Sequence, residues 1–305
     1  MTHDELDSPS RRETGNGHDR HSRHPAPSRV APPLDASRGD LEAWLGLSGG
    51  RYTRAAGPLW SIVAAVCTAL FVWSMTLVPH WNLSRIMFQC WTNAAVVFLG
   101  LWCLFMLANK FNKTRIQERA LRQEDLFPRR ADFVLSPATA VDVLEAIRTR
   151  CDRPREFLLF NRLMMALSNL GNIGEVRDVG TVLESQSDAD ANAVQSSYTS
   201  IRALIWVMPV LGFIGTVVGL SDAIGSFQGV LDQQAGADAA TIRDRLTPVV
   251  LGLRTAFETT LVALLAAVAI QLLTTFVYRR EEDLLDGCTQ YCNDHVISRL
   301  KLTDL

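Results

Sequence analysis

The chain has 305 residues, of which 48% are hydrophobic and 20% are charged, and its formal net charge is −2. This near-balanced charge gives no sign of a nucleic-acid partner. The six cysteines fall in apolar and polar stretches alike, so we expect no disulfide framework.

Four segments have the length and apolarity of transmembrane helices. Apart from Arg254 and Glu258 they contain no charged residue, and each approaches or exceeds the roughly 20 residues that span a bilayer. The sequence therefore predicts an all-α, multi-pass membrane protein with four transmembrane helices and long cytoplasmic helical extensions. The four segments are Leu59–Pro79, Ile86–Asn109, Ala203–Leu220 and Val249–Val277.

Lys and Arg residues concentrate in the two terminal tails and in the segment between the second and third spans. Basic residues of this kind stay on the cytoplasmic side of a membrane. We therefore expect both termini and the central segment to lie in the cytoplasm. Residues 1–56 contain no apolar run, so no signal peptide is expected.

Composition divides the chain into five parts. The polar tail is expected to be disordered, and the central part is expected to be helical, with membrane hairpins before and after it. The parts are the tail at 1–56, the first hairpin at 57–109, the cytoplasmic segment at 110–200, the second hairpin at 201–278 with an external loop at 221–247, and a C-terminal helix at 279–305.

The cytoplasmic segment carries helix start signals. Ser136-Pro137 is typical of an N-cap followed by proline in the first turn, and Pro154 marks the start of a second helix. Glu175–Ala203 contains no proline, so it is expected to run as one helix into the third span.

The third span carries residues that suit close helix packing. Gly212, Gly215 and Gly219 allow helix backbones to approach closely. Pro209 frees a backbone carbonyl and is expected to kink the helix. Thr216 either returns its hydroxyl to its own backbone or faces a polar path. Taken alone, this span favours packing over a pore.

The fourth span contains an acid and a base. Arg254 and Glu258 are four residues apart, so they can pair on one helix face. The alternative is that Glu258 is unpaired near the midplane and carries a proton. The spacing leaves structure and transport equally open.

Threonines surround Glu258. Thr255 and Thr259 flank it, and Thr260 lies at a depth comparable to that of Thr216. Glu258 and Thr260 are about 160° apart around the helix. They cannot both face one narrow lumen, so one must contact a neighbouring helix or subunit.

The polar residues outside the spans give little chemistry. Cys288-x-x-x-Cys292-x-x-His295 offers three metal ligands on one helix, but a fourth is missing, so we expect no metal site. No Walker motif, nucleophile elbow or zinc-protease motif occurs. We expect no enzyme activity, no catalytic residue and no cofactor.

The third and fourth spans together resemble the MotA/TolQ/ExbB proton-channel family. Pro209-Val-Leu-Gly-Phe-Ile-Gly-Thr-Val-Val-Gly-Leu220 is similar to the family's Pro-x-x-Gly-Leu-x-Gly-Thr-Val-x-Gly signature. Gly252-Leu-Arg-Thr-Ala-Phe-Glu-Thr-Thr-Leu-Val-Ala-Leu264 is similar to its Gly-(Ile/Leu)-x-x-Ala-Leu-x-x-Thr-x-x-Gly-Leu run. Two spans before a large cytoplasmic segment resemble the MotA arrangement more than the three-span ExbB one.

The resemblance implies a homo-oligomer, a pentamer, around a single-span partner similar to MotB, ExbD or TolR, in contact with membrane lipid. It implies that Thr216 and Thr260 line the ion path. Thr255 stands where ExbB-like members have an acid, Glu258 supplies an acid one turn later, and Ala263 replaces a glycine.

These observations favour a proton-channel subunit of an energy-transducing complex. Thr216, Thr260, Thr255 and Thr259 would line the path, with Glu258 holding or relaying charge and Arg254 tuning it. The rival function is a membrane scaffold or sensor of the same fold that does not conduct. The sequence leaves open which process is energised (motility, protein transport, envelope maintenance or defence) and whether the ion is H⁺ or Na⁺.

Overall fold

The computed structural model describes residues 52–53, 62–63, 65–70, 73–74, 91–122, 134–151, 153–168, 170, 176–231 and 239–300. The chain divides into two units, 1–32 and 33–305, and all described residues belong to the second. The predicted tail, except for Tyr52 and Thr53, and most of the first predicted span lie outside the described residues.

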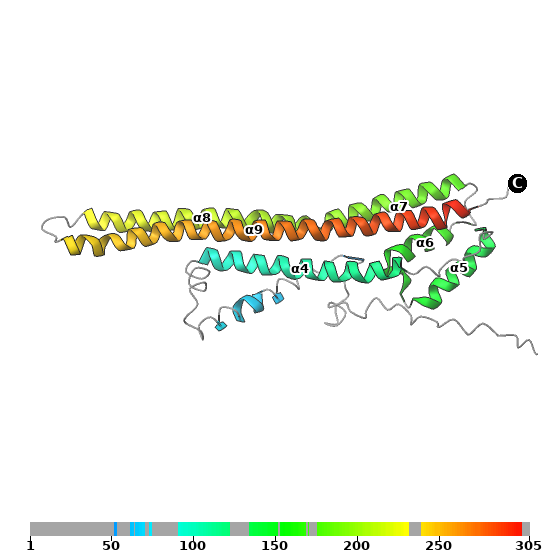
Figure 1. Cartoon of the computed structure of the whole chain (residues 1–305), viewed down its shortest axis with the longest axis horizontal. Coiled ribbons are helices and arrows are strands. Elements are labelled where there is room, and N and C mark those ends of the chain that lie inside the picture. Colours follow the sequence, from blue (N-terminus) through cyan, green and yellow to red (C-terminus); the bar gives the residue numbers. More distant parts are fainter. Residues whose placement is uncertain are drawn as a thin grey trace, which may run out of the picture. The chain divides into compact units, whose positions relative to one another are not determined.

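Three long helices correspond to the second, third and fourth predicted spans (Figure 1). They are α4 (Trp91–Leu121), α8 (Thr199–Leu231) and α9 (Ala239–His295). Each is long and apolar enough to cross a membrane. The described residues are almost entirely helical, so the prediction of an all-α fold is confirmed for them.

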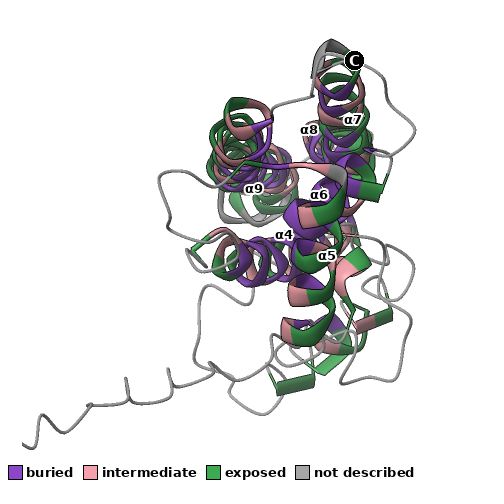
Figure 2. Ribbon diagram, turned by 90° about the vertical axis from the view of Figure 1, so that its right-hand side faces the viewer, coloured by how far each residue is buried: buried purple, intermediate pink, exposed green. Residues whose placement is uncertain are grey.

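The three long helices pack on one another. α8 and α9 lie side by side, and α4 contacts both. Figure 2 shows buried residues on the sides of these helices that face each other. On the opposite sides, Trp206 and Phe213 of α8 are 74% and 67% exposed, and Phe257 of α9 is 66% exposed. Large apolar side chains exposed in this way suit helices that contact lipid or further subunits.

The predicted external loop at 221–247 is mostly helical. α8 continues to Leu231 and α9 begins at Ala239, so both ends of this segment are helical, and its position outside the membrane stays a prediction. Ile224 and Phe227 are three residues apart, and this apolar spacing is the one that continues a helix.

The predicted single helix from Glu175 to Ala203 is interrupted. α7 (Val176–Ser197) ends at Ser197 and α8 begins at Thr199, with a turn at Tyr198 between them. The Tyr198 side chain is fully buried. Its ring packs edge-on against Tyr278 of α9, with centroids 5.2 Å apart. The break is therefore a packed joint, held by the contact of the buried Tyr198 ring with Tyr278.

The central segment forms two further helices. α5 (Pro137–Arg150) begins with the predicted cap: Ser136 and Thr139 form a capping box, with proline in the first turn. The predicted second helix begins as a 3-10 turn at Pro154–Glu156 and continues as α6 (Leu158–Ser168). A bridge between Leu135 and Leu300 ties the start of α5 to the residues that follow α9. These helices share one apolar core with α4 and α9.

Two ion pairs connect α4 to α9. Lys110 Nζ lies 3.1 Å from Glu281 Oε1, and both side chains are only 1% exposed. Arg280 Nε lies 2.6 Å from Glu118 Oε1, and the second Arg280 nitrogen bonds Glu118 Oε2 at 2.9 Å. Lys110 and Arg280 belong to the basic segments from which the orientation of the spans was predicted. They also hold α4 and α9 together.

The Lys110–Glu281 pair also contacts the joint between α7 and α8. The Lys110 ammonium lies 4.1 Å from the centroid of the Tyr198 ring. Thr114 donates a hydrogen bond to Glu281 Oε1 at 3.4 Å. Cation–π contacts strengthen when the cation is removed from water. One buried ion pair therefore joins three helices.

Removing one member of this pair should destabilise the protein strongly. Lys110→Met leaves the Glu281 carboxylate buried without its partner, which costs about 3–5 kcal/mol, whereas the double variant Lys110→Met/Glu281→Leu should be about as stable as the parent. Denaturant unfolding of the detergent-solubilised protein measures both. Arg153→Gln, which breaks an exposed pair with Glu156, is the control and should change stability by less than about 1 kcal/mol. Equal losses in Lys110→Met and Arg153→Gln would contradict this assignment.

Candidate functional site

Thr216 of α8 and Thr260 of α9 meet between the two helices. Their hydroxyls hydrogen-bond to each other. Thr216 Oγ1 also lies 3.1 Å from the Gly212 carbonyl of its own helix and 3.3 Å from the Ala256 carbonyl of α9. Thr260 Oγ1 lies 3.2 Å from the same Gly212 carbonyl. The structure therefore brings together the two threonines that the sequence placed at similar depth.

This threonine pair offers more acceptors than donors. Each hydroxyl carries one proton and two lone pairs, and the carbonyls of Gly212 and Ala256 add further oxygens within 3.1–3.3 Å of Thr216. Both threonine residues are partly exposed on the surface of the single chain. The cluster is uncharged and rich in oxygen, which suits water or a small cation.

Glycine makes this close approach possible. A Cβ at Gly212 would lie 2.6 Å from the Ala263 Cβ, and one at Gly219 would lie 2.9 Å from the Gly252 carbonyl. A Cβ at Gly215 would lie 2.7 Å from Thr259 Oγ1. The three predicted packing glycines thus form the face of α8 that contacts α9. Pro209 lies inside α8, one turn before Gly212.

Thr259 lies on a different side of α9 from the threonine pair. It is fully buried and donates to the Ala256 carbonyl at 2.8 Å. Thr259 and Thr92 of α4 both lie next to Gly215. Thr92 is also fully buried, and its hydroxyl has no hydrogen-bond partner among the residues that the structure describes. Sequence reasoning missed Thr92 because a single threonine in an apolar span carries no periodic signal.

Arg254 and Glu258 form an ion pair on the surface of α9. Arg254 Nε donates to Glu258 Oε1 at 2.6 Å, and the two side chains are 63% and 20% exposed. Thr255 returns its hydroxyl to the Leu251 carbonyl. Within one chain, neither Arg254 nor Glu258 hydrogen-bonds to the threonine pair. The predicted pairing of Arg254 with Glu258 on one helix face is thus present. The roles in ion conduction expected of Glu258, Arg254 and Thr255 stay predictions.

Polar residues occur at two levels of the three-helix bundle. Thr92, Gly215 and Thr259 meet at one level, and Lys110, Tyr198 and Glu281 meet at the other. At 1.5 Å per residue, the two levels are about 27 Å apart along α4 and about 33 Å apart along α9. Thr92 and Thr259 lie inside the predicted spans Ile86–Asn109 and Val249–Val277, whereas Lys110 and Glu281 lie just past the ends of these spans.

A second buried ion pair lies beyond the apolar part of α9. Arg162 of α6 bonds Asp190 of α7 at 2.7 Å and the Thr289 hydroxyl of α9 at 2.8 Å. Gln186 donates to the other Asp190 oxygen at 3.0 Å. Arg162 and Asp190 are 1% and 4% exposed. Sequence reasoning missed this network, because Arg162 and Asp190 read as ordinary charges of a helical segment.

The Cys288, Cys292 and His295 pattern belongs to helix packing. Both thiols are buried, and the His295 ring stacks on Tyr291 with centroids 4.2 Å apart. Cys292 lies about 22 Å beyond the last apolar residue of the fourth span. Burial raises the pKa of its thiol to about 11. A thiol with such a pKa stays protonated at neutral pH, and metals bind the thiolate. Among the described residues, no group of His, Cys, Asp or Glu is placed to hold a metal ion.

Comparison with known families explains this arrangement. The sequence profile of the MotA/TolQ/ExbB proton channel family matches residues 159–288. That range begins in α6, includes α7 and α8, and extends into α9 past the Arg254–Glu258 pair. No curated protein and no solved structure shows significant similarity to the chain. Residues 159–288 thus match the MotA/TolQ/ExbB proton channel family, and the resemblance in the third and fourth spans is confirmed. With three helices able to cross a membrane, the chain is a multi-pass membrane protein.

Adding one methyl group at Gly215 should separate α8 from α4 and α9. Gly215→Ala places a Cβ within 2.8 Å of both Thr259 and Thr92 side chains, and overpacking of this kind costs about 1–3 kcal/mol. Thermal unfolding in detergent measures the loss. Gly225→Ala, in the same helix, is the matched control because its Cβ meets nothing within 4 Å. If Gly215→Ala is as stable as Gly225→Ala, the close contact is not required.

Proposed function

We propose that this chain is the ion-channel subunit of an energy-transducing complex in a bacterial inner membrane. In this proposal the complex couples the proton motive force to the motion of a single-span partner. One elementary charge moved through 100 mV supplies about 2.3 kcal/mol, so a few ions per cycle can drive a conformational step. Both termini and the helices α5–α7 would face the cytoplasm, where basic residues stay.

The observation that carries the proposal is the threonine pair. Thr216 and Thr260 lie in the region that matches the proton channel family, and their hydroxyls meet beside the carbonyls of Gly212 and Ala256. Such an oxygen cluster replaces part of the hydration shell of a passing ion. It needs no fixed charge of its own, so the residue that binds and releases the ion would come from the partner.

An oligomer would complete the site. Thr216 and Thr260 are partly exposed in the single chain, and large apolar side chains of α8 and α9 are exposed around them. A homo-oligomer, with five subunits as the family resemblance implies, would surround a partner helix similar to that of MotB, ExbD or TolR. The threonine pairs of all subunits would then line one path.

Glu258 is the residue on which the two candidate functions differ. Its pairing with Arg254 on the surface of α9 leaves a neutral pair, which is the state expected of a scaffold or sensor that does not conduct. In the channel function, Glu258 holds or relays charge and Arg254 tunes its affinity for protons. Thr255 and Thr259 complete the polar surface around Glu258.

Ion flux through the reconstituted complex tests the proposal. Thr216→Val/Thr260→Val removes both hydroxyls with little change in side-chain volume, so proton uptake into liposomes under a membrane potential should fall about tenfold or more, since each lost interaction of about 1.4 kcal/mol is one factor of ten. Assembly with the partner, measured by copurification, should be unchanged. Unchanged proton uptake in this variant would favour the scaffold.

Glu258→Gln separates the two roles of the ion pair. In the channel function it should abolish ion-driven activity and leave subunit assembly intact, because the amide keeps the shape of the carboxylate and loses its charge. Thr275→Val, which removes an exposed hydroxyl that bonds its own helix at Gln271, is the matched control. Normal activity in Glu258→Gln would return Glu258 to a structural role.

A further inference from the structure

An aromatic and basic surface lies where α4 and α9 leave their apolar segments. The Phe111 ring of α4 contacts the Phe276 ring of α9, with centroids 6.3 Å apart. Two guanidinium groups lie against the Phe111 ring, that of Arg115 at 4.3 Å and that of Arg280 at 4.8 Å from its centroid. Each helix thus contributes one aromatic ring and one arginine. These four residues form what we call the edge surface.

The edge surface is accessible in the single chain. Arg115 is exposed, Phe276 is 59% exposed, and the Arg280 side chain is 30% exposed. The Glu118 carboxylate accepts hydrogen bonds from two nitrogens of Arg280, whereas a guanidinium group carries five N–H donors. Both arginines can therefore still donate hydrogen bonds to a ligand.

Positive charge exceeds negative charge around Glu118. Arg280 bonds this carboxylate at 2.6 and 2.9 Å, and Arg122 and Arg115 also act on it electrostatically. These four side chains carry three positive charges and one negative charge. One carboxylate cannot neutralise three guanidinium groups, so the edge surface favours an anion.

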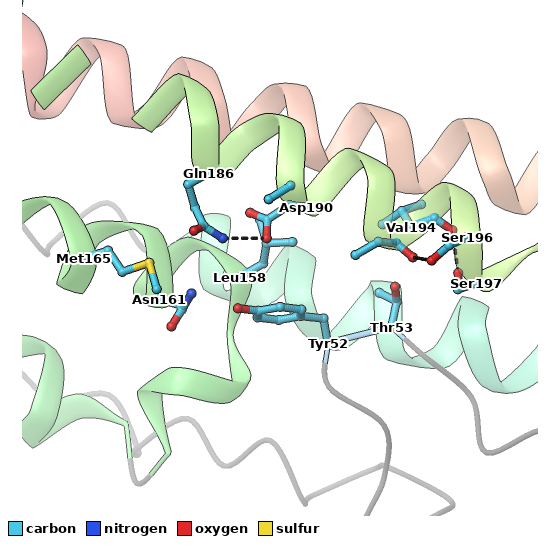
Figure 3. A pocket seen from close by; sticks show the side chains of 12 residues that line it. Tyr52, Thr53, Leu158, Asn161, Met165, Gln186, Asp190, Val194, Ser196 and Ser197 are labelled. Carbon is cyan, nitrogen blue, oxygen red and sulfur yellow. Dashed lines mark hydrogen bonds between the residues drawn. The ribbon is translucent and has the colours of Figure 1, made fainter. Parts of the chain in front are cut away.

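The buried ion pair between α6 and α7 is balanced by comparison. Figure 3 shows Asp190 in the wall of the cavity between these helices, where the Gln186 amide donates to one of its oxygens. Arg162 bonds the other oxygen at 2.7 Å. One guanidinium group there meets one carboxylate, so that pair fulfils a structural role and leaves no excess charge of its own.

The edge surface lies at the level of lipid headgroups. Arg115 lies about 9 Å beyond Asn109, the last residue of the second predicted span, and Arg280 lies about 4.5 Å beyond Val277, the last residue of the fourth. The headgroup region is about 5–7 Å thick on each side of the hydrocarbon core. Asp283 is an exposed carboxylate that lies about 4.5 Å further along α9 than Arg280. The arginines are therefore the charges nearest to the lipid phosphates.

Apolar side chains continue from the edge surface into the spans. Leu272 precedes Phe276 by four residues and Leu104 precedes Phe111 by seven, so each lies on the same helix face as its aromatic residue. Both leucines are exposed. Guanidinium groups bind phosphate oxygens in a bidentate manner, and basic sites between membrane helices bind anionic headgroups. A lipid can thus meet arginines at its phosphate and apolar side chains along its acyl chains.

We propose that the edge surface binds an anionic phospholipid, with Arg115 and Arg280 on the headgroup phosphate and Phe276 and Leu272 against an acyl chain. Because Arg280 also bonds Glu118, the bound lipid would strengthen the contact between α4 and α9. Lipid binding at this surface needs neither ion flux nor a partner protein, so it is independent of the proposed channel function.

Phosphatidylglycerol is the probe, and phosphatidylcholine, which has a phosphate but no net charge, is the reference lipid. Each is titrated into the full-length protein in dodecyl maltoside, and bound lipid is counted by native mass spectrometry. Phosphatidylglycerol should bind at least about fivefold more tightly and should raise the unfolding temperature in a saturable way, because a ligand that binds only the folded state stabilises it. Equal affinities for the two lipids, or equal stabilisation by inorganic phosphate, would overturn the proposal.

Substitutions of Arg115 locate the binding. Arg115→Gln changes an exposed side chain, so it should fold like the parent and lower the affinity for phosphatidylglycerol about fivefold, which corresponds to about 1 kcal/mol for one basic residue at an anionic surface. Arg115→Lys keeps the charge and should keep most of the affinity. Arg148→Gln removes the same charge from an exposed position on α5 and is the matched control. Parent-like affinity in Arg115→Gln, or an equal loss in Arg148→Gln, would refute the assignment.

A second copy of the chain is the other possible occupant of this surface, and the same spectra test it. Arg115→Glu should weaken the binding of phosphatidylglycerol further and leave the number of subunits unchanged. Dissociation of the oligomer in Arg115→Glu, with phosphatidylglycerol still bound as in the parent, would mean that a neighbouring subunit covers the edge surface, and the lipid proposal would then be wrong.

Discussion

The arrangement of the long helices depends on the buried ion pair between Lys110 and Glu281. Both side chains are almost completely removed from solvent, so neither charge is tolerable unless the other is in place. The same ammonium contacts the Tyr198 ring, which fixes the point where α7 ends and α8 begins. The pair therefore aligns α4, α8 and α9 with one another, and the threonine pair, about 30 Å away along α9, depends on that alignment.

A single helix connects the parts of the protein that differ most in environment. α9 begins before the Arg254–Glu258 pair, contains Thr260, and continues without a break to Thr289, which bonds Arg162. α7 and α8, by contrast, are two helices with a joint. A displacement of α9 in the membrane would thus reach the Arg162–Asp190 network directly, whereas a displacement of α8 would pass through Tyr198. The two helices of the hairpin are unequal in how they transmit motion.

The sequence predicts best what depends on local pattern. Apolar length predicts the spans and the shared depth of Thr216 and Thr260, Ser136-Pro137 predicts the capped start of α5, and two short motifs predict the family. Contacts between different helices have no local sequence pattern. Lys110 and Glu281 are far apart in the chain, and each resembles an ordinary charged residue at the end of a span. The same holds for Thr92 beside Thr259. The joint at Tyr198 depends on the packing of a buried aromatic ring. No proline or glycine beside it marks this break between α7 and α8 in the sequence.

The two polar levels of the bundle constrain the length of the chain between them. α4 and α9 are fixed at Thr92 and Thr259 on one level and at Lys110 and Glu281 on the other, and α8 is fixed at Gly215 and by Tyr198, which directly precedes it. One inserted residue in an α-helix turns everything after it by about 100° and shifts it by about 1.5 Å. An insertion between Thr259 and Glu281 would therefore point the carboxylate away from Lys110. Related chains should vary in their loops and termini and keep a constant residue spacing inside these three segments.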